Sequence, residues 1–201
     1  MRIVVSEFIS LDGVVQAPGG PQEDTDGGFA HGGWSHPFFD PEVMGGAIDG
    51  TLRAADALLF GRRTWRTMAD AWPERAGDPF ADRMNALPKY VVSGTLEESA
   101  LTWHNSRLIP AADGGALDRI RELRAGEGGD LLVMGSPTLV RGMLDAGLVD
   151  ELRLMVIPVL LGGGKSIFPS GGALRPLELV SAETAGTGTQ VCVYRPAAGQ
   201  E

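Results

Sequence analysis

Two segments of the chain place a glycine beside cationic or hydroxyl side chains where an apolar strand is expected to turn into a helix. The first is residues 58–65 (LLFGRRTW), in which the apolar run ends at Gly61. A helix start has unpaired N–H groups and a partial positive charge. A helix start here, together with the guanidinium groups of Arg62 and Arg63 and the hydroxyl of Thr64, would form a phosphate site. The alternative is an ordinary helix start with two solvated arginines.

The second segment is residues 132–138 (LVMGSPT), which again reads as strand, glycine and helix start. Gly135 would end the strand, and Ser136 is a typical N-cap residue. Open N–H groups at this turn could bind a pyrophosphate, while the alternative is a capped helix without a ligand. The segment lacks the Gly-x-Gly-x-x-Gly pattern of ordinary dinucleotide-binding folds. Because ligands bind at the carboxyl ends of parallel strands, two such turns in one sheet favour a cofactor more than either alone.

Two further motifs contain residues that could take part in binding or catalysis, and each also has a purely structural explanation. Residues 10–13 (SLDG) put Asp12 at the end of the first expected strand, where it could orient a substrate or relay a proton. An Asp-Gly turn explains the same residues. Residues 160–166 (LLGGGKS) resemble part of a phosphate-binding loop, but Val159 occupies the place of its first glycine. A flexible turn between strands is an equally good interpretation.

The stretch 16–37 is a long loop rich in glycine, proline and acidic residues, and a loop of this length is usually functional or disordered. His31 and His36, with Asp40, could suggest a metal site, but their spacing is not that of a ligand cluster, so no metal is predicted. The aromatic residues Trp34, Phe38 and Phe39 could form a lid over a ligand or anchor the loop to the core; we favour the anchor.

The elements that must position these residues alternate between strands and helices. Apolar runs predict strands at 2–9, 57–60, 89–93, 107–109, 130–134, 151–161, 177–181 and 189–194, and helical spacing predicts helices at 40–55, 63–71, 117–126 and 138–144. Strands that alternate with helices form largely parallel sheets in α/β folds. The last strands have no helix between them, which predicts an antiparallel edge.

The composition limits the function classes. The 201 residues form one expected domain, 1–201, and carry a net charge of −9, which disfavours nucleic acids and anionic membranes as partners. The chain has one cysteine, Cys192, so it has no intramolecular disulfide and suits a reducing cytoplasm. No signal-peptide pattern opens the chain, and no apolar run approaches the roughly 18 residues of a membrane span.

Several motifs together resemble a known family. Residues 59–65 are similar to the NADPH-binding turn of dihydrofolate reductases. Residues 143–152 (MLDAGLVDEL) and 157–165 (IPVLLGGGK), with residues 10–13, resemble the reductase domain of the bifunctional riboflavin-biosynthesis deaminase-reductase. The deaminase half of that enzyme is missing, and Val14 stands where those reductases carry a basic residue.

The resemblance implies a dihydrofolate-reductase-like three-layer α/β fold, with a mixed, mostly parallel sheet, an antiparallel C-terminal edge and helices on both faces. It implies NADPH as cofactor and a homodimer. By position, the cofactor would contact Gly61, Arg62, Arg63, Thr64, Ser93, Gly94, Gly135, Ser136 and Thr138. Asp49 or Glu42 would correspond to the helical acid that contacts the pterin in dihydrofolate reductases.

The sequence therefore predicts a cytoplasmic NADPH-dependent reductase of a small heterocycle. The substrate would resemble 5-amino-6-(5-phosphoribosylamino)uracil or a pteridine, and Asp12 would supply the proton. A non-catalytic protein that binds NADPH or another ligand and keeps the fold is the alternative.

Overall fold

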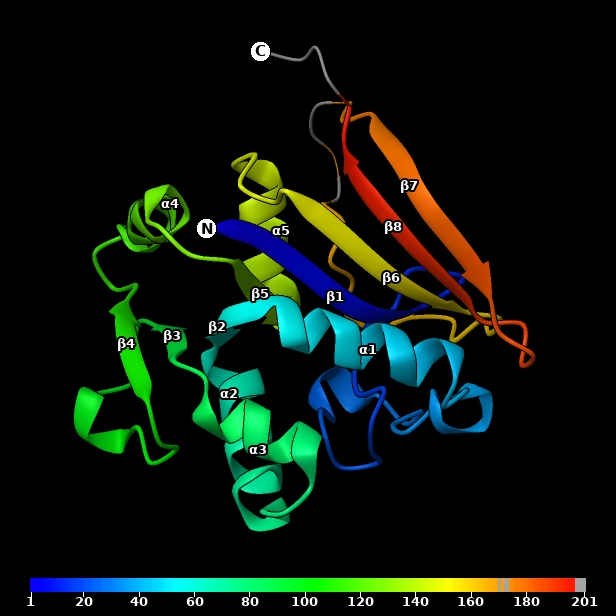
Figure 1. Ribbon diagram of the computed structural model, residues 1–201, viewed down its shortest axis with the longest axis horizontal. Helices are drawn as coiled ribbons and strands as arrows, with labels where there is room; N and C mark the ends of the chain where they lie inside the picture. Colours follow the sequence, from blue (N-terminus) through cyan, green and yellow to red (C-terminus); the bar gives the residue numbers. More distant parts are fainter. Residues whose placement is uncertain (170, 172–173, 198–201) are drawn as a thin grey trace.

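A central sheet of eight strands carries helices on both of its faces (Figure 1). The computed structural model describes residues 1–169, 171 and 174–197. The elements run in the order β1 (Arg2–Ser10), α1 (Val43–Ala54), β2 (Ala55–Gly61), α2 (Arg62–Ala71), α3 (Pro79–Ala86), β3 (Lys89–Ser93), β4 (Ser106–Pro110), α4 (Ala116–Ala125), β5 (Asp130–Met134), α5 (Pro137–Asp145), β6 (Glu151–Ile157), β7 (Leu177–Thr184) and β8 (Gln190–Pro196).

The strand order is β4-β3-β2-β5-β1-β6-β8-β7. The strands from β4 to β6 in this order are all parallel, whereas β8 is antiparallel to both β6 and β7. The predicted α/β class and the antiparallel C-terminal edge are thus confirmed. Because β5 lies between β2 and β1, the two glycine turns predicted from the sequence follow adjacent strands, and they leave the sheet at the same edge.

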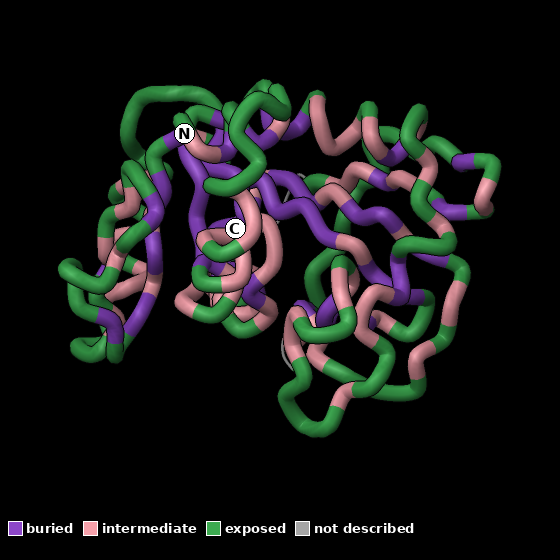
Figure 2. Tube along the Cα trace, turned by 90° about the horizontal axis from the view of Figure 1, so that it is seen from below, coloured by how far each residue is buried: buried purple, intermediate pink, exposed green. Residues whose placement is uncertain are grey.

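Alternation along β1 divides the core into two layers. Ile3 and Val5 pack with Ile120 of α4 and Val140 of α5 on one face of the sheet. Val4 packs on the other face, in a cluster to which α1, α2 and α3 contribute Leu52, Trp65 and Met84. Figure 2 shows the buried positions running along the central strands between these two helical layers. Burying each large apolar side chain stabilises the fold by about 1.5–3 kcal/mol, so both faces of the sheet contribute.

Element boundaries differ from the sequence-based prediction, most clearly at the end of β6 and the start of α1. The strand predicted for 151–161 ends at Ile157, because Pro158 has no N–H with which to continue the ladder. The helix expected from residue 40 begins at Val43, and Asp40 Oδ1 accepts the N–H groups of Glu42 and Val43. Helix α3 was not predicted.

The missed helix α3 does carry a start signal in the sequence. Asp78 accepts hydrogen bonds from the N–H groups of Phe80 and Ala81, and Pro79 occupies the first helical position.

Within the described residues, no helix combines the length and apolar character that crossing a membrane requires.

Candidate functional site

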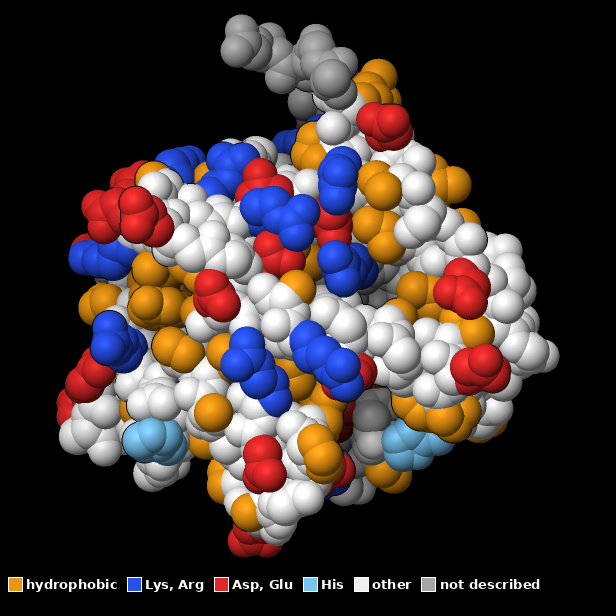
Figure 3. Space-filling model, in the orientation of Figure 1, with side chains coloured by type: hydrophobic (Ala, Val, Ile, Leu, Met, Phe, Trp, Pro, Cys, Tyr) orange, Lys and Arg blue, Asp and Glu red, His pale blue; other side chains and the backbone are white. Residues whose placement is uncertain are grey.

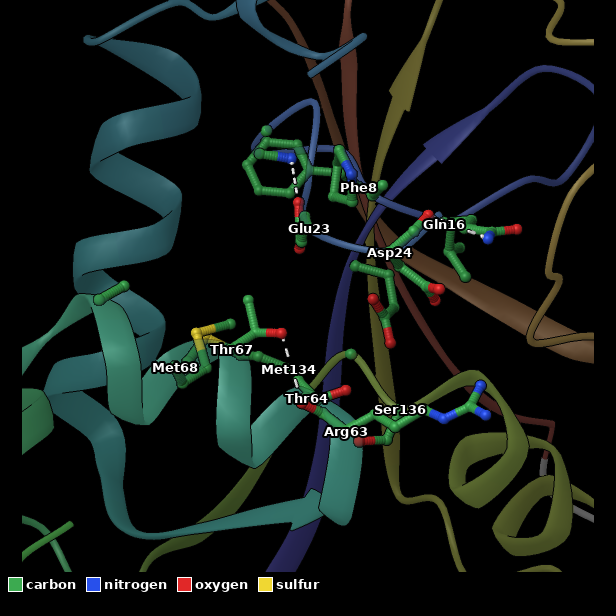
Figure 4. Close-up of a pocket in the computed structure, with 18 of the residues that line it drawn as sticks. Phe8, Gln16, Glu23, Asp24, Arg63, Thr64, Thr67, Met68, Met134 and Ser136 are labelled. Carbon is green, nitrogen blue, oxygen red and sulfur yellow. Dashed lines mark hydrogen bonds between the residues drawn. The ribbon is translucent and has the colours of Figure 1, made fainter. Parts of the chain in front are cut away.

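A cavity of about 1150 Å³ opens at the carboxyl edge of the parallel strands. It is lined by β1, the loop that follows β1, α1, α2, and the ends of β5 and β6. On the face shown in Figure 3, the surface is hollowed between the α2–α3 region and this loop. In the close-up of Figure 4, Glu23 and Asp24 of the loop lie across the cavity from Thr64 and Thr67 of α2. Pockets for single small molecules usually measure 300–1,000 Å³, so this cavity has room for more than one small ring.

The two glycine turns touch each other beside the cavity. The Gly61 N–H donates a hydrogen bond to Ser136 Oγ at 2.7 Å. A Cβ placed on Gly135 would lie 2.8 Å from Thr64 Cγ2, and Gly135 has a φ of +77°. Only glycine allows this close approach without strain.

Ser136 does not cap α5, so that prediction was wrong. Its φ of +67° is left-handed, and its side chain makes no capping hydrogen bond to the helix. The hydroxyl accepts from Gly61 instead. Helix α2 also begins without a side-chain cap, at Gly61. Two helix starts whose first N–H groups receive no side-chain cap therefore lie side by side, which is the arrangement that binds anions.

The structure divides the predicted cofactor residues into two groups. Arg63, Thr64, Gly135 and Ser136 line the cavity, whereas Gly61, Arg62, Ser93, Gly94 and Thr138 are not among its lining residues. Gly61 still contributes through its bond to Ser136. Arg63 is largely exposed and forms an ion pair with Asp26 of the loop. Ser93 Oγ accepts the N–H groups of Thr95 and Leu96, so its hydroxyl stabilises the turn after β3.

Asp12 lies outside the cavity, and its carboxylate is occupied elsewhere. It accepts the Leu161 and Gly162 N–H groups at 3.1 Å and 2.7 Å, and the Ser10 hydroxyl at 2.6 Å. The hydrogen bond from Ser10, helped by the two backbone N–H groups, holds the pKa of Asp12 below its ordinary value. Asp12 therefore joins the end of β1 to the segment after β6 as a stable carboxylate, a poor state for a proton donor.

The loop over residues 16–37 is tied down from both sides. The buried Trp34 donates from Nε1 to Gln16 O at 2.7 Å, so it anchors the loop, as the sequence analysis favoured. Lys165 Nζ bonds Asp24 at 2.5 Å and Asp26 at 2.8 Å from the far side. The glycine-rich segment that resembled a phosphate-binding loop thus uses its lysine to fix one wall of the cavity.

Of the remaining sequence candidates, one lines the cavity and the two helical acids do not. Asp49 pairs with Arg53 one helical turn later, and neither Asp49 nor Glu42 lines the cavity. His36 does line it. Within the part of the chain that the structure describes, no group of three His, Cys, Asp or Glu side chains is arranged to hold a metal ion.

Sequence reasoning singled out none of the acidic residues that line the cavity, and the most buried of these is Glu7. Glu7 lies on β1 and lines the cavity, yet it is only 5% exposed. Burial raises its pKa to about 8; the Coulombic effect of Glu23 adds to the rise, and the Gly135 backbone acts in the opposite direction. The pattern did carry a signal, because Glu7 interrupts the apolar positions Ile3, Val5 and Ile9 on one face of the strand.

Comparison with known proteins places this geometry in a family. The model of the RibD C-terminal domain matches residues 2–191. The chain belongs to the RibD C-terminal domain family. This confirms the resemblance stated from residues 10–13 and 143–165.

Individual relatives agree with this membership. The chain is 27% identical to the uncharacterized protein YyaP of Bacillus subtilis over 198 residues, which cover 96% of this chain and 94% of YyaP. A putative riboflavin biosynthesis protein from Shewanella sp. PV-4 has a similar structure, with a TM-score of 0.74, 20% identity and coverage of 98% and 99% of the two chains.

The dihydrofolate reductase of Enterococcus faecalis, solved with NADP(H), is also similar in structure. The TM-score is 0.60 at 12% identity, and 97% of this chain and 96% of that chain are covered. At this identity the match shows the fold alone. The RibD C-terminal domain thus has the dihydrofolate-reductase-like fold expected from the sequence.

Proposed function

We propose that this RibD C-terminal domain is an NADPH-dependent reductase of a small heterocycle. The observation that carries the proposal is the pair of helix starts without side-chain caps, α2 and α5, beside a cavity that also holds Arg63 and a buried acid. Helix starts and a guanidinium group bind phosphates, and a buried acid is a typical partner of a reducible ring. Membership of a family related to riboflavin-biosynthesis reductases supports the same reaction class.

The residues present fit a phosphorylated dinucleotide at one end of the cavity. Thr64, Gly135 and Ser136 would hold its phosphates against the two helix starts, and Arg63 would contact the adenosine 2′-phosphate. The dinucleotide would supply a hydride when bound. The dihydrofolate reductase of similar structure was solved with NADP(H), which makes NADPH the first cofactor to test.

The other end of the cavity suits a ring with N–H groups. Glu23 and Asp24 offer carboxylate acceptors there, and Phe8, Ile48 and Met155 offer apolar surface. Arg66 and Arg75 also line the cavity and could bind a phosphate on the substrate. This set of side chains suits an aminopyrimidine that carries a phosphoribosyl group, such as 5-amino-6-(5-phosphoribosylamino)uracil. A pteridine offers similar ring N–H groups but no phosphate.

The test combines binding and turnover. A thermal-shift panel with NADPH, NADH and FMN should show the largest stabilisation with NADPH, because a ligand that binds only the folded state raises its apparent stability. Absorbance of the reduced nicotinamide should then fall when phosphorylated or unphosphorylated aminopyrimidines or pterins are added. Tight NADPH binding without oxidation across the panel would favour the alternative, a non-catalytic ligand-binding protein.

The homodimer implied by the family resemblance stays a prediction. Sedimentation of the purified chain with and without NADPH would measure the oligomeric state directly.

A further inference from the structure

Glu7 occupies an unusual place for a carboxyl group. It lies in the middle of β1, where its register partner on β6 is Leu154, and the strand is flanked on the other side by β5. Its face of the sheet is otherwise apolar, with Ile3 and Val5 before it in the same core cluster. Only 5% of the residue is exposed, although it lines the cavity. Glu7 therefore lines the cavity, while the sheet and its neighbours shield its side chain from bulk water.

The hydrogen bonding of Glu7 is incomplete. Its Oε1 atom is buried and has no hydrogen-bond partner among the described residues. A buried polar atom without a partner costs free energy, so native proteins keep such groups mainly where a ligand or a reaction uses them. Glu7 lines the cavity that the proposed function assigns to cofactor and substrate.

Among the residues that the structure describes, no cation pairs with the Glu7 carboxyl group. The charged or titratable side chains around the same cavity are Glu23, Asp24, Asp26 and His36 from the loop, Arg63 and Arg66 from α2, and Arg75 after α2. None of these side chains forms a hydrogen bond or ion pair with Glu7. Two further arginines, from α5 and β6, also have other partners: Arg141 donates to Ser166 O, and Arg153 bonds Glu151 and Thr51. A carboxyl group desolvated without a cation favours its neutral form, which is an O–H donor.

We propose that Glu7 is the proton donor of the reduction, and that it protonates the nitrogen or oxygen of the substrate double bond whose carbon is reduced. The inference rests on the proposed function, and it moves the role that the sequence suggested for Asp12 to a residue inside the cavity. A carboxyl group held neutral by burial is the form that general acids require near neutral pH.

The O–H bond of the Glu7 carboxyl breaks, and a new N–H or O–H bond forms on the substrate. The adjacent carbon of the C=N or C=O bond gains a hydride from the reduced nicotinamide dinucleotide named in the proposed function, which is thereby oxidised. Glu7 is left as a carboxylate and recovers its proton from water after product leaves.

The first test needs no activity. In protein with ¹³C-labelled glutamate, the side-chain carboxyl resonance that is missing from E7Q belongs to Glu7, and its shift against pH gives the protonation state. We expect Glu7 to be protonated at pH 7 and to ionise near pH 8. A resonance that is already that of a carboxylate at pH 6 would overturn the proposal.

The second test follows a single turnover of NADPH oxidation against pH. The wild-type rate should fall about tenfold per pH unit above the ionisation of Glu7, because only the protonated form donates. E7Q keeps the shape of the side chain but has no acidic proton, so the rate should drop by roughly 10²–10⁴-fold and lose this alkaline limb. NADPH affinity, measured by nicotinamide fluorescence, should stay within about threefold of the wild type, which shows that the variant is folded and loaded.

E23Q is the matched control, since it removes a second carboxyl group from the same cavity. Whatever its effect on the rate, E23Q should keep the alkaline limb and move it to lower pH, because the Glu23 charge that helps to raise the pKa of Glu7 is gone. The proposal is overturned if E7Q retains the wild-type rate and pH profile, or if the limb disappears in E23Q. If the wild type oxidises NADPH with none of the substrates, the proposed function fails and the role of Glu7 fails with it. Turnover by the wild type with an unchanged E7Q refutes the role of Glu7 alone.

Discussion

The N–H group of Gly61 and the hydroxyl oxygen of Ser136 lie 2.7 Å apart, although 75 residues separate them in the chain. The bond joins the turn that follows β2 to the turn that follows β5. It turns Ser136 away from the helix-capping role that its position suggests, and Gly61, at the start of α2, has no side chain with which to cap that helix. The proposed phosphate site is therefore a joint property of two turns.

Removing the Ser136 hydroxyl should destabilise the protein. S136A leaves the Gly61 N–H without its acceptor, and an unsatisfied, partly buried donor costs about 1–3 kcal/mol. S136G loses the same bond but relieves the left-handed backbone at this position, so its loss should be smaller. Urea denaturation measures both variants. Equal stability of S136A and the wild type would contradict a structural role for this bond.

Adding a methyl group at Gly135 should disturb the junction between the turns. G135A would place a Cβ 2.8 Å from Thr64 Cγ2 on a backbone with positive φ, and we expect a loss of about 1–3 kcal/mol. T64S removes the clashing methyl group, so the double variant should recover the steric part of this loss. G142A is the matched control, because a Cβ on Gly142 of α5 meets no atom within 4 Å and alanine favours helices. Denaturation that shows G135A as harmless as G142A would contradict the close approach.

Arg63 and Arg62 should differ in their effect on cofactor preference. Arg63 lines the cavity and Arg62 does not. A hydrogen-bonded contact to a charged group is worth about 1.5–3 kcal/mol, so R63A should weaken NADPH relative to NADH by roughly 10–100-fold. R62A removes the same charge next to it and should change the ratio far less. The ratio of dissociation constants measures this, and equal effects of the two variants would contradict the placement of Arg63.

Asp12 should stabilise a loop junction rather than donate a proton. Its pKa is held below the ordinary value, so its stabilising contribution is present above an unfolded-state pKa of about 3.9 and is lost as the pH falls through the lower folded-state value. D12N should speed amide hydrogen exchange at Leu161 and Gly162 at neutral pH, since the neutral side chain accepts more weakly. Unchanged exchange in D12N would show that the two hydrogen bonds add no protection.

Glu7 should make the stability of the fold depend on pH in the opposite sense. Its folded-state pKa of about 8 lies above the unfolded value, so its contribution is fully present below about pH 4.3 and is lost as the pH rises through 8. Between these values, one proton gives a slope of up to about 1.4 kcal/mol per pH unit. The unfolding free energy of the wild type minus that of E7Q should therefore fall across this range. A difference that does not vary with pH would show that Glu7 is ionised in the folded protein.

Much of the fold was predictable because it depends on local pattern. Apolar runs and their alternation locate the strands, and helical spacing locates α1, α2, α4 and α5. The helix that was missed, α3, is short. Its start is marked by the capping residue Asp78, and its apolar residues show no clear helical period. The prediction extended β6 past Ile157 because the apolar run continues there. The strand ends earlier, since Pro158 has no N–H group for the hydrogen-bond ladder.

The candidate site was predictable only in part. Glycine, hydroxyl and arginine residues next to strand ends indicate where phosphates can bind, because helix starts have free N–H groups whatever the rest of the chain does. Of these residues, Arg63, Thr64, Gly135 and Ser136 line the cavity.

What the tertiary structure alone decided is the chemistry of the acids. Asp12 follows the strand end by sequence, but the Ser10 hydroxyl and the backbone N–H groups of Leu161 and Gly162 hold it as a carboxylate outside the cavity. Glu7 lies within an ordinary strand, but the neighbouring strands and the loop bury it without a cation at the edge of the cavity. The charge state of a carboxyl group depends on solvent and partners brought together by folding. The amino-acid sequence therefore determined the elements and their turns, and the packing of those elements determined which acid keeps its proton.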